Sequence, residues 1–139
     1  MKKTILIACL LFSTLFLAAQ SGSWVIRLNN KTILSTRQEA ALKNVKKIKL
    51  TDWKKSGKLE ILFAEDEKNT WMRYFQLVDE SDNELVRKDS TLHAKISLAV
   101  LRKAFAGKKL IKIYTTVSPL DPNIAIRMRR VHLCTLQLP

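Results

Sequence analysis

The stretch TWMRYFQLVDESDNELVRK, residues 70–88, is the clearest guide to the fold. Residues 70–78 form a strand-like run with apolar side chains on both faces, and residues 84–88 form a second, shorter run. The segment Asp79–Asn83 between them is dense in residues that favour tight turns. We therefore predict an antiparallel hairpin whose turn is Asp79–Asn83.

Further strand-like runs lie on both sides of this hairpin at regular spacing. The dipeptide Asn29-Asn30 separates two of them and favours a second hairpin turn. The alternation of the last run slips near Arg129-Arg130, so we expect a β-bulge there. The runs are residues 23–28, 31–34, 45–51, 58–63, 109–117 and 124–138.

One segment carries the signals of a helix. Ser97 is suited to the N-cap, apolar side chains follow at helical spacing, and Gly107 is a typical C-terminal stop. We therefore predict one short helix within residues 97–107. Residues 36–44 also contain helix formers, and their pattern fits a single turn or a loop equally well.

These elements predict a fold class. About seven or eight short strands with one inserted helix are typical of an all-β, antiparallel β-sandwich of Ig-like or Greek-key type. Two alternatives stay open, an α+β fold and a small closed barrel, because residues 84–117 read as strand, helix and strand. The chain has 139 residues and 16.0 kDa, the size of one domain.

The N-terminus resembles a secretory signal peptide. Lys2 and Lys3 precede an apolar run over residues 5–17, and small residues follow at Ala18 and Ala19. We predict a signal peptide at residues 1–19 and one β-sandwich domain at residues 20–139. A bilayer span needs about 20 apolar residues, so we expect no transmembrane anchor. The short lysine-led signal is typical of bacteria and indicates export to the periplasm or beyond the cell.

Several enzyme classes lack their characteristic residues. The three glycines, Gly22, Gly57 and Gly107, are too widely spaced for a phosphate-binding loop. The two histidines, His93 and His132, are not flanked by a motif of nucleophilic catalysis. We therefore predict a protein without enzymatic activity and without a cofactor.

An alternative to a non-enzymatic binding protein is a small copper or redox protein. His132 and Cys134 are two residues apart on a predicted strand and are expected on one face, with Met128 nearby and His93 as a third ligand. These are ligand types of electron-transfer copper sites. No further ligand follows Cys134, so we predict no metal. Cys134 is the one cysteine after residue 19, and its sequence leaves open whether it is buried or reactive.

The strongest functional signal is positive charge. The chain has 25 Lys+Arg and 12 Asp+Glu, a net charge of +13. On the predicted strands, cationic side chains alternate with apolar ones, which favours a basic outer sheet face. Trp53, in a predicted turn, would add an aromatic contact. The candidate binding residues are Lys47, Lys49, Trp53, Lys112, Arg127 and Arg129.

Together these features predict an exported, non-enzymatic binding module. Its basic surface would bind an anionic envelope component, such as an anionic polysaccharide, lipopolysaccharide or a lipid surface. A protein partner is a further candidate, and so is an accessory subunit without a ligand of its own. Nucleic acid is not expected, because the signal directs the chain out of the cytoplasm and no nucleic-acid-binding motif is present.

Overall fold

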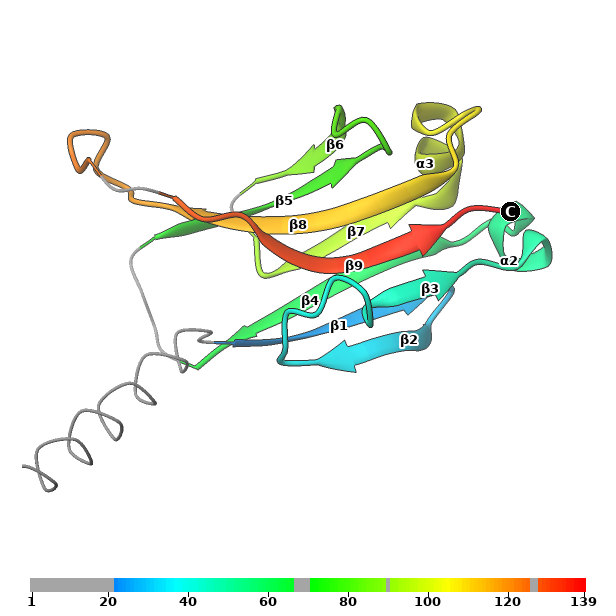
Figure 1. Cartoon of the computed structure of the whole chain (residues 1–139), viewed down its shortest axis with the longest axis horizontal. Coiled ribbons are helices and arrows are strands. Elements are labelled where there is room, and N and C mark those ends of the chain that lie inside the picture. The colour runs from blue at the N-terminus through cyan, green and yellow to red at the C-terminus, as the bar shows by residue number, and fades with distance from the viewer. Residues whose placement is uncertain (1–21, 67–70, 90, 126–127) are drawn as a thin grey trace, which may run out of the picture.

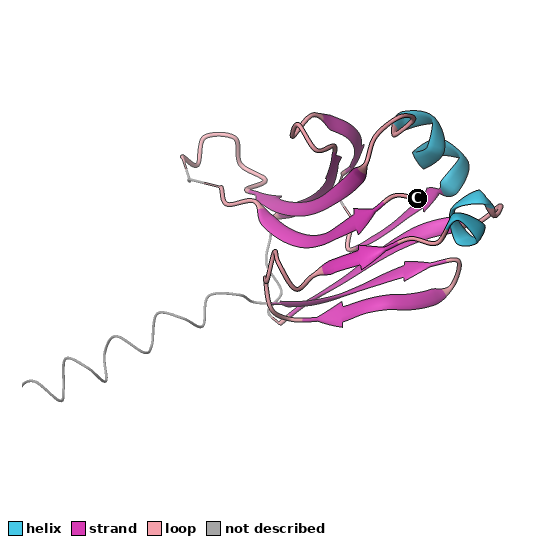
Figure 2. Ribbon diagram, turned by 45° about the vertical axis from the view of Figure 1, so that its right-hand side comes forward, coloured by secondary structure: helices cyan, strands magenta, loops and turns pink. Residues whose placement is uncertain are grey.

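The computed structural model describes residues 22–66, 71–89, 91–125 and 128–139. The predicted signal peptide and Arg127 lie outside the described residues. About half of the described residues are in strands, which form two sheets accompanied by two short helices (Figures 1 and 2). The mostly β character predicted from the sequence is therefore confirmed.

The two sheets contain four and five strands. The first has the order β2 (Lys31–Thr36), β1 (Gly22–Leu28), β4 (Lys58–Glu65) and β7 (His93–Ser97), and all its pairs are antiparallel. The second has the order β3 (Val45–Lys47), β9 (Val131–Gln137), β8 (Leu110–Ser118), β5 (Met72–Val78) and β6 (Glu84–Lys88). In this second sheet β3 pairs in parallel with β9, and the other pairs are antiparallel.

Both predicted hairpins are present. Strands β5 and β6 pair antiparallel, and the Asp79 carboxylate accepts hydrogen bonds from the backbone N–H groups of Ser81 and Asn83, both at 2.9 Å. Strands β1 and β2 meet at Asn29 and Asn30, whose φ angles of 51° and 68° lie in the left-handed region that Asn tolerates. The turn residues therefore fix the pairing in both hairpins.

The core lies between the two sheets. Apolar side chains from both sheets fill it, such as Ile26 and Ile61 from the first sheet and Phe75 and Ile113 from the second, all fully buried. The indole N–H of Trp24 in β1 donates to the Leu133 carbonyl in β9 at 3.1 Å, which joins the two sheets directly.

The predicted helix is confirmed as α3 (Leu98–Ala104). The Ser97 side chain accepts a hydrogen bond from the Val100 N–H at 3.2 Å, so Ser97 is the N-cap. Leu98 and Leu101 are fully buried, and Gly107 follows the helix with φ of 74°. Within the described residues, no helix has the length and apolar character needed to cross a membrane.

The prediction of a strand over residues 45–51 followed by a turn is only partly confirmed: the strand begins at Val45 but is shorter than predicted. Strand β3 ends at Lys47, and α2 (Leu50–Lys54) follows, with the Lys49 carbonyl accepting from the N–H groups of Asp52 and Trp53. The reason is tertiary packing, because this short helix lets Trp53 pack against the core. Strand β7 was also not predicted, and the described residues form nine strands.

The prediction for the last strand is partly wrong. Strand β9 begins at Val131, so residues 128–130 are not part of it. The bulge lies at Leu133 instead of near Arg129, because His132 pairs with Tyr114 and Cys134 pairs with the adjacent Ile113. One extra residue on β9 is accommodated between these two pairs.

Candidate functional site

The predicted binding residues separate into two regions. Lys112 lies on the outer face of β8, and Arg129 lies two residues before the start of β9. Lys47 ends β3, Lys49 lies between β3 and α2, and Trp53 is in α2. The strands β3, β9 and β8 are neighbours in one sheet. The predicted basic face depends on such an arrangement of the strands that carry its lysines.

The cations on the outer face around Lys112 are paired with acidic side chains. Asp82 accepts a hydrogen bond from Arg130 at 2.8 Å and lies 3.7 Å from the Lys112 ammonium group. The hydrogen bond from Arg130 is the main reason that the pKa of Asp82 is lowered. Arg129 is paired with Glu39 in the same way. Lys112 and Arg129 are therefore held in ion pairs.

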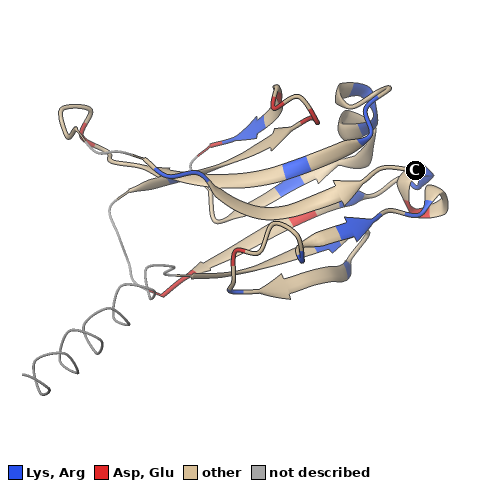
Figure 3. Cartoon of the chain, viewed as in Figure 1, with Lys and Arg blue, Asp and Glu red and all other residues tan. Residues whose placement is uncertain are grey.

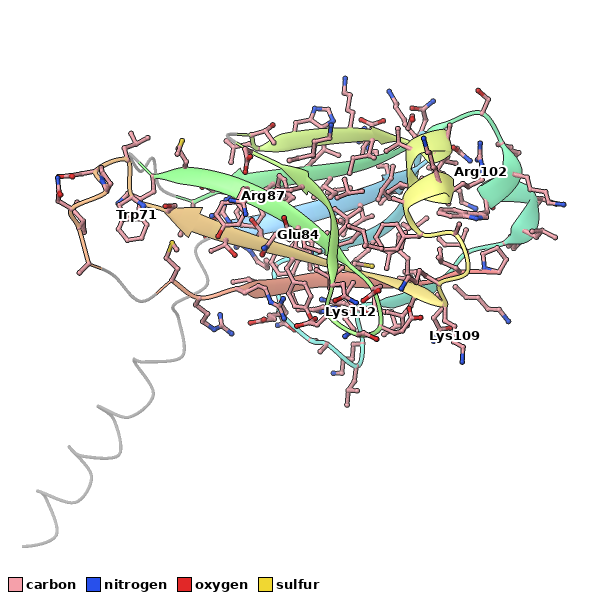
Figure 4. The ribbon with its side chains drawn as sticks, turned by 90° about the horizontal axis from the view of Figure 1, so that it is seen from above. Trp71, Glu84, Arg87, Arg102, Lys109 and Lys112 are labelled. Atoms are coloured by element: carbon pink, nitrogen blue, oxygen red, sulfur yellow. The ribbon has the colours of Figure 1, made fainter. Side chains whose placement is uncertain are left out.

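Lysines without such partners gather at the end of the molecule where α2 and α3 lie. Figure 3 shows Lys and Arg on both helices and on the adjoining end of β3. In Figure 4, Arg102 and Lys109 are at this end, and Trp71 is at the opposite one. We call this region the cationic end. Its cations are Lys31, Lys47, Lys49, Lys54, Lys55, Lys58, Arg102, Lys103, Lys108 and Lys109.

The cationic end is assembled by contacts between segments distant in sequence. The Arg102 guanidinium donates to the Trp53 carbonyl at 2.6 Å and to the Lys55 carbonyl at 3.1 Å, which fastens α2 to α3. The Asn29 side-chain amide donates to the Asp52 carbonyl at 3.1 Å, which fastens the β1–β2 turn to α2. The position of these lysines therefore depends on packing, not on strand alternation.

Five of these lysines are exposed and have no acidic partner within the described ranges. The acids at this end are paired with other cations: Asp52 with Lys55 at 3.3 Å and Asp79 with Lys108 at 2.6 Å. Because these acids already have partners, the remaining cations at this end have no counter-charge from the residues that the structure describes. The five lysines are Lys31, Lys47, Lys49, Lys54 and Lys103.

Two hollows open at the cationic end. The first hollow has a volume of about 270 Å³, and the lysines at positions 31, 47, 49 and 55 line it together with Asp52 and Asn29. The second hollow, of about 420 Å³, is lined by Asn29, Lys55 and Lys58, among others. Because Asn29 and Lys55 line both, the two hollows adjoin.

Gly57 lies close to the Asn29 side chain where the second hollow meets the β1–β2 turn. A Cβ atom at this position would lie 1.8 Å from Oδ1 of Asn29, a distance that no side chain tolerates. The backbone at Gly57 therefore approaches the Asn29 side chain closely and holds it in place.

Trp53 does not stand free as an aromatic platform. It is partly buried and packs against the core, with its carbonyl bound by Arg102. Its contribution to this region is structural, because it positions α2 and thereby Lys49 and Lys55.

The structure separates the candidate metal ligands. His93 is on β7, where its ring nitrogen Nε2 lies 2.8 Å from a Glu60 carboxylate oxygen. His132 and Cys134 are both on β9 but on opposite faces, because the bulge at Leu133 reverses the alternation, so the expectation of a shared face is wrong. Within the described ranges, no group of three or more His, Cys, Asp or Glu side chains is placed to hold a metal ion.

Cys134 is a buried thiol. Its side chain is fully inaccessible, and burial raises its pKa from 9.0 to about 12. His132 is also buried, and burial lowers its pKa, so the ring is neutral near pH 7. The thiol therefore packs as a small apolar group.

Sequence reasoning missed Asn29, Lys31 and Lys55 as members of the site. The signals that point to them are the Asn29-Asn30 turn with a lysine directly after it and the adjacent lysines Lys54-Lys55. Comparison with known proteins adds no relative: no family model, no curated protein and no solved structure matches the chain.

Proposed function

We propose that this protein is an exported, non-enzymatic binding module whose cationic end binds an anionic component of the bacterial envelope. The observation that carries the proposal is the first hollow, which four lysines line at one end of the molecule. Three of them, Lys31, Lys47 and Lys49, are exposed and have no acidic partner in the described part of the chain. Lysines in this arrangement attract polyanions.

The contrast with the rest of the surface supports this location. On the outer face of the second sheet, Asp82 pairs with both Lys112 and Arg130, and Glu39 pairs with Arg129. A ligand would have to displace these acids there, whereas Lys47 and Lys49 have no such partners. The binding surface therefore differs from the sheet face expected from strand alternation, although two of the expected lysines belong to it.

The fold proposed with this function is a β-sandwich of Greek-key type. Five connections, β2–β3, β3–β4, β4–β5, β6–β7 and β7–β8, pass from one sheet to the other, a pattern that is typical of Greek-key sandwiches. Export is proposed from the signal-like residues 1–19, which also favours an envelope ligand. The copper or redox alternative gains no support, because Cys134 and His132 lie on opposite faces of β9.

Retention on immobilised heparin against a salt gradient tests the proposal, with the full chain purified as processed by a bacterial host. We expect retention at low salt and steep weakening as salt rises, since charge-driven binding is screened. A double variant, Lys47→Gln with Lys49→Gln, should elute at clearly lower salt. The matched control, Lys88→Gln with Lys95→Gln, removes the same charge from exposed positions on β6 and β7.

Two outcomes would contradict the proposal. The first is the absence of retention at low salt, which would favour an accessory subunit without a ligand of its own. The second is an equal loss of retention in both double variants, which would mean that overall net charge, and not the cationic end, causes the binding.

A further inference from the structure

The two hollows of the cationic end adjoin, and we call them together the trough. Asn29 and Lys55 line both hollows and therefore mark the boundary between them. Their volumes, about 270 and 420 Å³, are each many times the roughly 30 Å³ that one water molecule occupies. Each hollow can therefore receive a group much larger than one water molecule.

Cations are distributed along the whole trough. Lys47 and Lys49 line the first hollow without acidic partners among the described residues. Lys58 lines the second hollow and is paired with the buried Glu60 at 3.3 Å, although its side chain stays 40% exposed. Lys55, paired with Asp52, lies at the boundary. A ligand with one compact anionic group would contact the lysines of one hollow. A ligand with anionic groups repeated along a chain would contact both sets.

The trough also offers groups that bind hydroxyls. Asp52 lines the first hollow, and Asn30 and Ser56, both exposed, line the second. The apolar side chains of Leu28, Ile33 and Ile48 complete the lining of the first hollow. Ammonium groups, hydrogen-bond acceptors and apolar surface together suit a sugar that carries acidic substituents.

At the boundary between the hollows, Asn29 is held by hydrogen bonds to two other segments. The Asn29 N–H donates to the Lys58 carbonyl at 3.0 Å, and its side-chain amide donates to the Asp52 carbonyl at 3.1 Å. Gly57 packs directly against the Oδ1 atom of Asn29. A preorganised site loses less conformational entropy on binding, which favours a defined ligand over loose attraction.

We propose that this trough is a two-part site for a linear anionic polysaccharide, which places one acidic sugar in each hollow and passes over Asn29 and Lys55. The inference rests on the proposed function and specifies its ligand. Occupation of the second hollow is intramolecular once the first is filled, so affinity increases with chain length until both are occupied.

Calorimetry with heparin-derived oligosaccharides of increasing length tests the two-part site. A tetrasaccharide should bind about tenfold or more tightly than a disaccharide, because linked groups act at millimolar effective concentration. Inorganic sulfate at matched ionic strength should bind more weakly than either. Ser56→Asp places a negative charge in the second hollow and should remove most of the gain from disaccharide to tetrasaccharide.

The matched control is Ser35→Asp, which adds the same charge at an exposed position on β2 that does not line either hollow. It should retain the gain with chain length, and both variants should keep the unfolding midpoint of the parent. The two-part site is overturned if affinity does not depend on length or if both variants lose the gain equally. Binding to vesicles with anionic lipid but not to oligosaccharides would also overturn it.

The two proposals fail in distinguishable ways. If immobilised heparin does not retain the protein at all, the proposed function fails. If heparin retains it through Lys47 and Lys49, but the oligosaccharides show no gain with length, the proposed function stands and the two-part site fails.

Discussion

The indole of Trp24 donates its hydrogen bond to the carbonyl of Leu133, the extra residue of the bulge in β9. A bulge leaves its extra residue outside the regular ladder, so the backbone groups of that residue need other partners. Trp24 supplies one from the opposite sheet and is itself almost fully buried, at 2% exposure. The bulge is thus stabilised by a contact that also joins the two sheets.

Replacing Trp24 by Phe should therefore lower the free energy of unfolding by about 2 kcal/mol. The change removes the donor to the Leu133 carbonyl and part of the packing volume in the core. Chemical denaturation of the parent and the variant measures the difference. Phe63, whose ring stacks on Trp24 at 6.0 Å between centroids, is partly exposed, so Phe63→Leu is a milder control. Equal stability of Trp24→Phe and the parent would show that the hydrogen bond does not stabilise the bulge.

The bulge also determines the chemistry of Cys134. Because it turns this side chain into the core, the thiol should react with a thiol reagent only as fast as the protein unfolds. We expect no measurable labelling at pH 8 in buffer and complete labelling in denaturant, followed by absorbance. Rapid labelling of the folded protein would contradict the buried placement.

The same burial predicts a dependence of stability on alkaline pH. The pKa of Cys134 is raised in the folded state, so the folded protein holds this proton more tightly than the unfolded chain. Its contribution to stability is complete below pH 9 and is lost as the pH rises from 9.0 to about 12. A Cys134→Ala variant, compared with the parent by denaturation at pH 8 and pH 10, should lose less stability over this interval. An equal loss in both proteins would exclude the thiol as the cause.

Local signals were sufficient for the hairpins and for α3, because turn residues and caps act on neighbours in the chain. The Asp79 carboxylate accepts a hydrogen bond from the backbone N–H of Asn83, and the Ser97 hydroxyl accepts one from the N–H of Val100. Asn29 and Asn30 adopt the positive φ angles that their turn needs. These elements therefore followed from the sequence with their boundaries within a few residues.

The remaining differences arise from contacts between distant segments. Helix α2 forms because Trp53 packs on the core and Arg102 binds its last carbonyls, about 50 residues away in the chain. The alternation of apolar and polar residues around Lys112 correctly predicts that its side chain lies on the outer face of the sheet. It does not indicate that Asp82, from the β5–β6 turn, is its ion-pair partner. The trough lies between the β1–β2 turn and α2, so strand alternation alone could not indicate it.

Asp79 predicts a dependence of stability on acidic pH. Its carboxylate is inaccessible to solvent, and hydrogen bonds from Lys108 and from the N–H of Asn83 lower its pKa well below the ordinary value. A lowered pKa means that this stabilisation is present above about pH 4 and is lost as the pH falls below it. Denaturation midpoints at pH 5 and pH 2.5 should differ more for the parent than for Asp79→Asn. An identical acid sensitivity in both proteins would contradict this role.

Arg102 predicts a link between the stability of α2 and binding at the cationic end. Arg102→Ala removes both hydrogen bonds to the carbonyls of Trp53 and Lys55, and it should lower the free energy of unfolding by about 1–2 kcal/mol. Arg102→Lys keeps the charge but loses the paired donors, so it should recover only part of the stability. Lys103→Ala, an exposed neighbour in α3, removes the same charge without these contacts and should leave stability nearly unchanged. If α2 positions the lysines of the trough, Arg102→Ala should also elute from heparin at lower salt than Lys103→Ala. Equal elution of the two variants would mean that Arg102 contributes charge alone and that the geometry of α2 does not matter for binding.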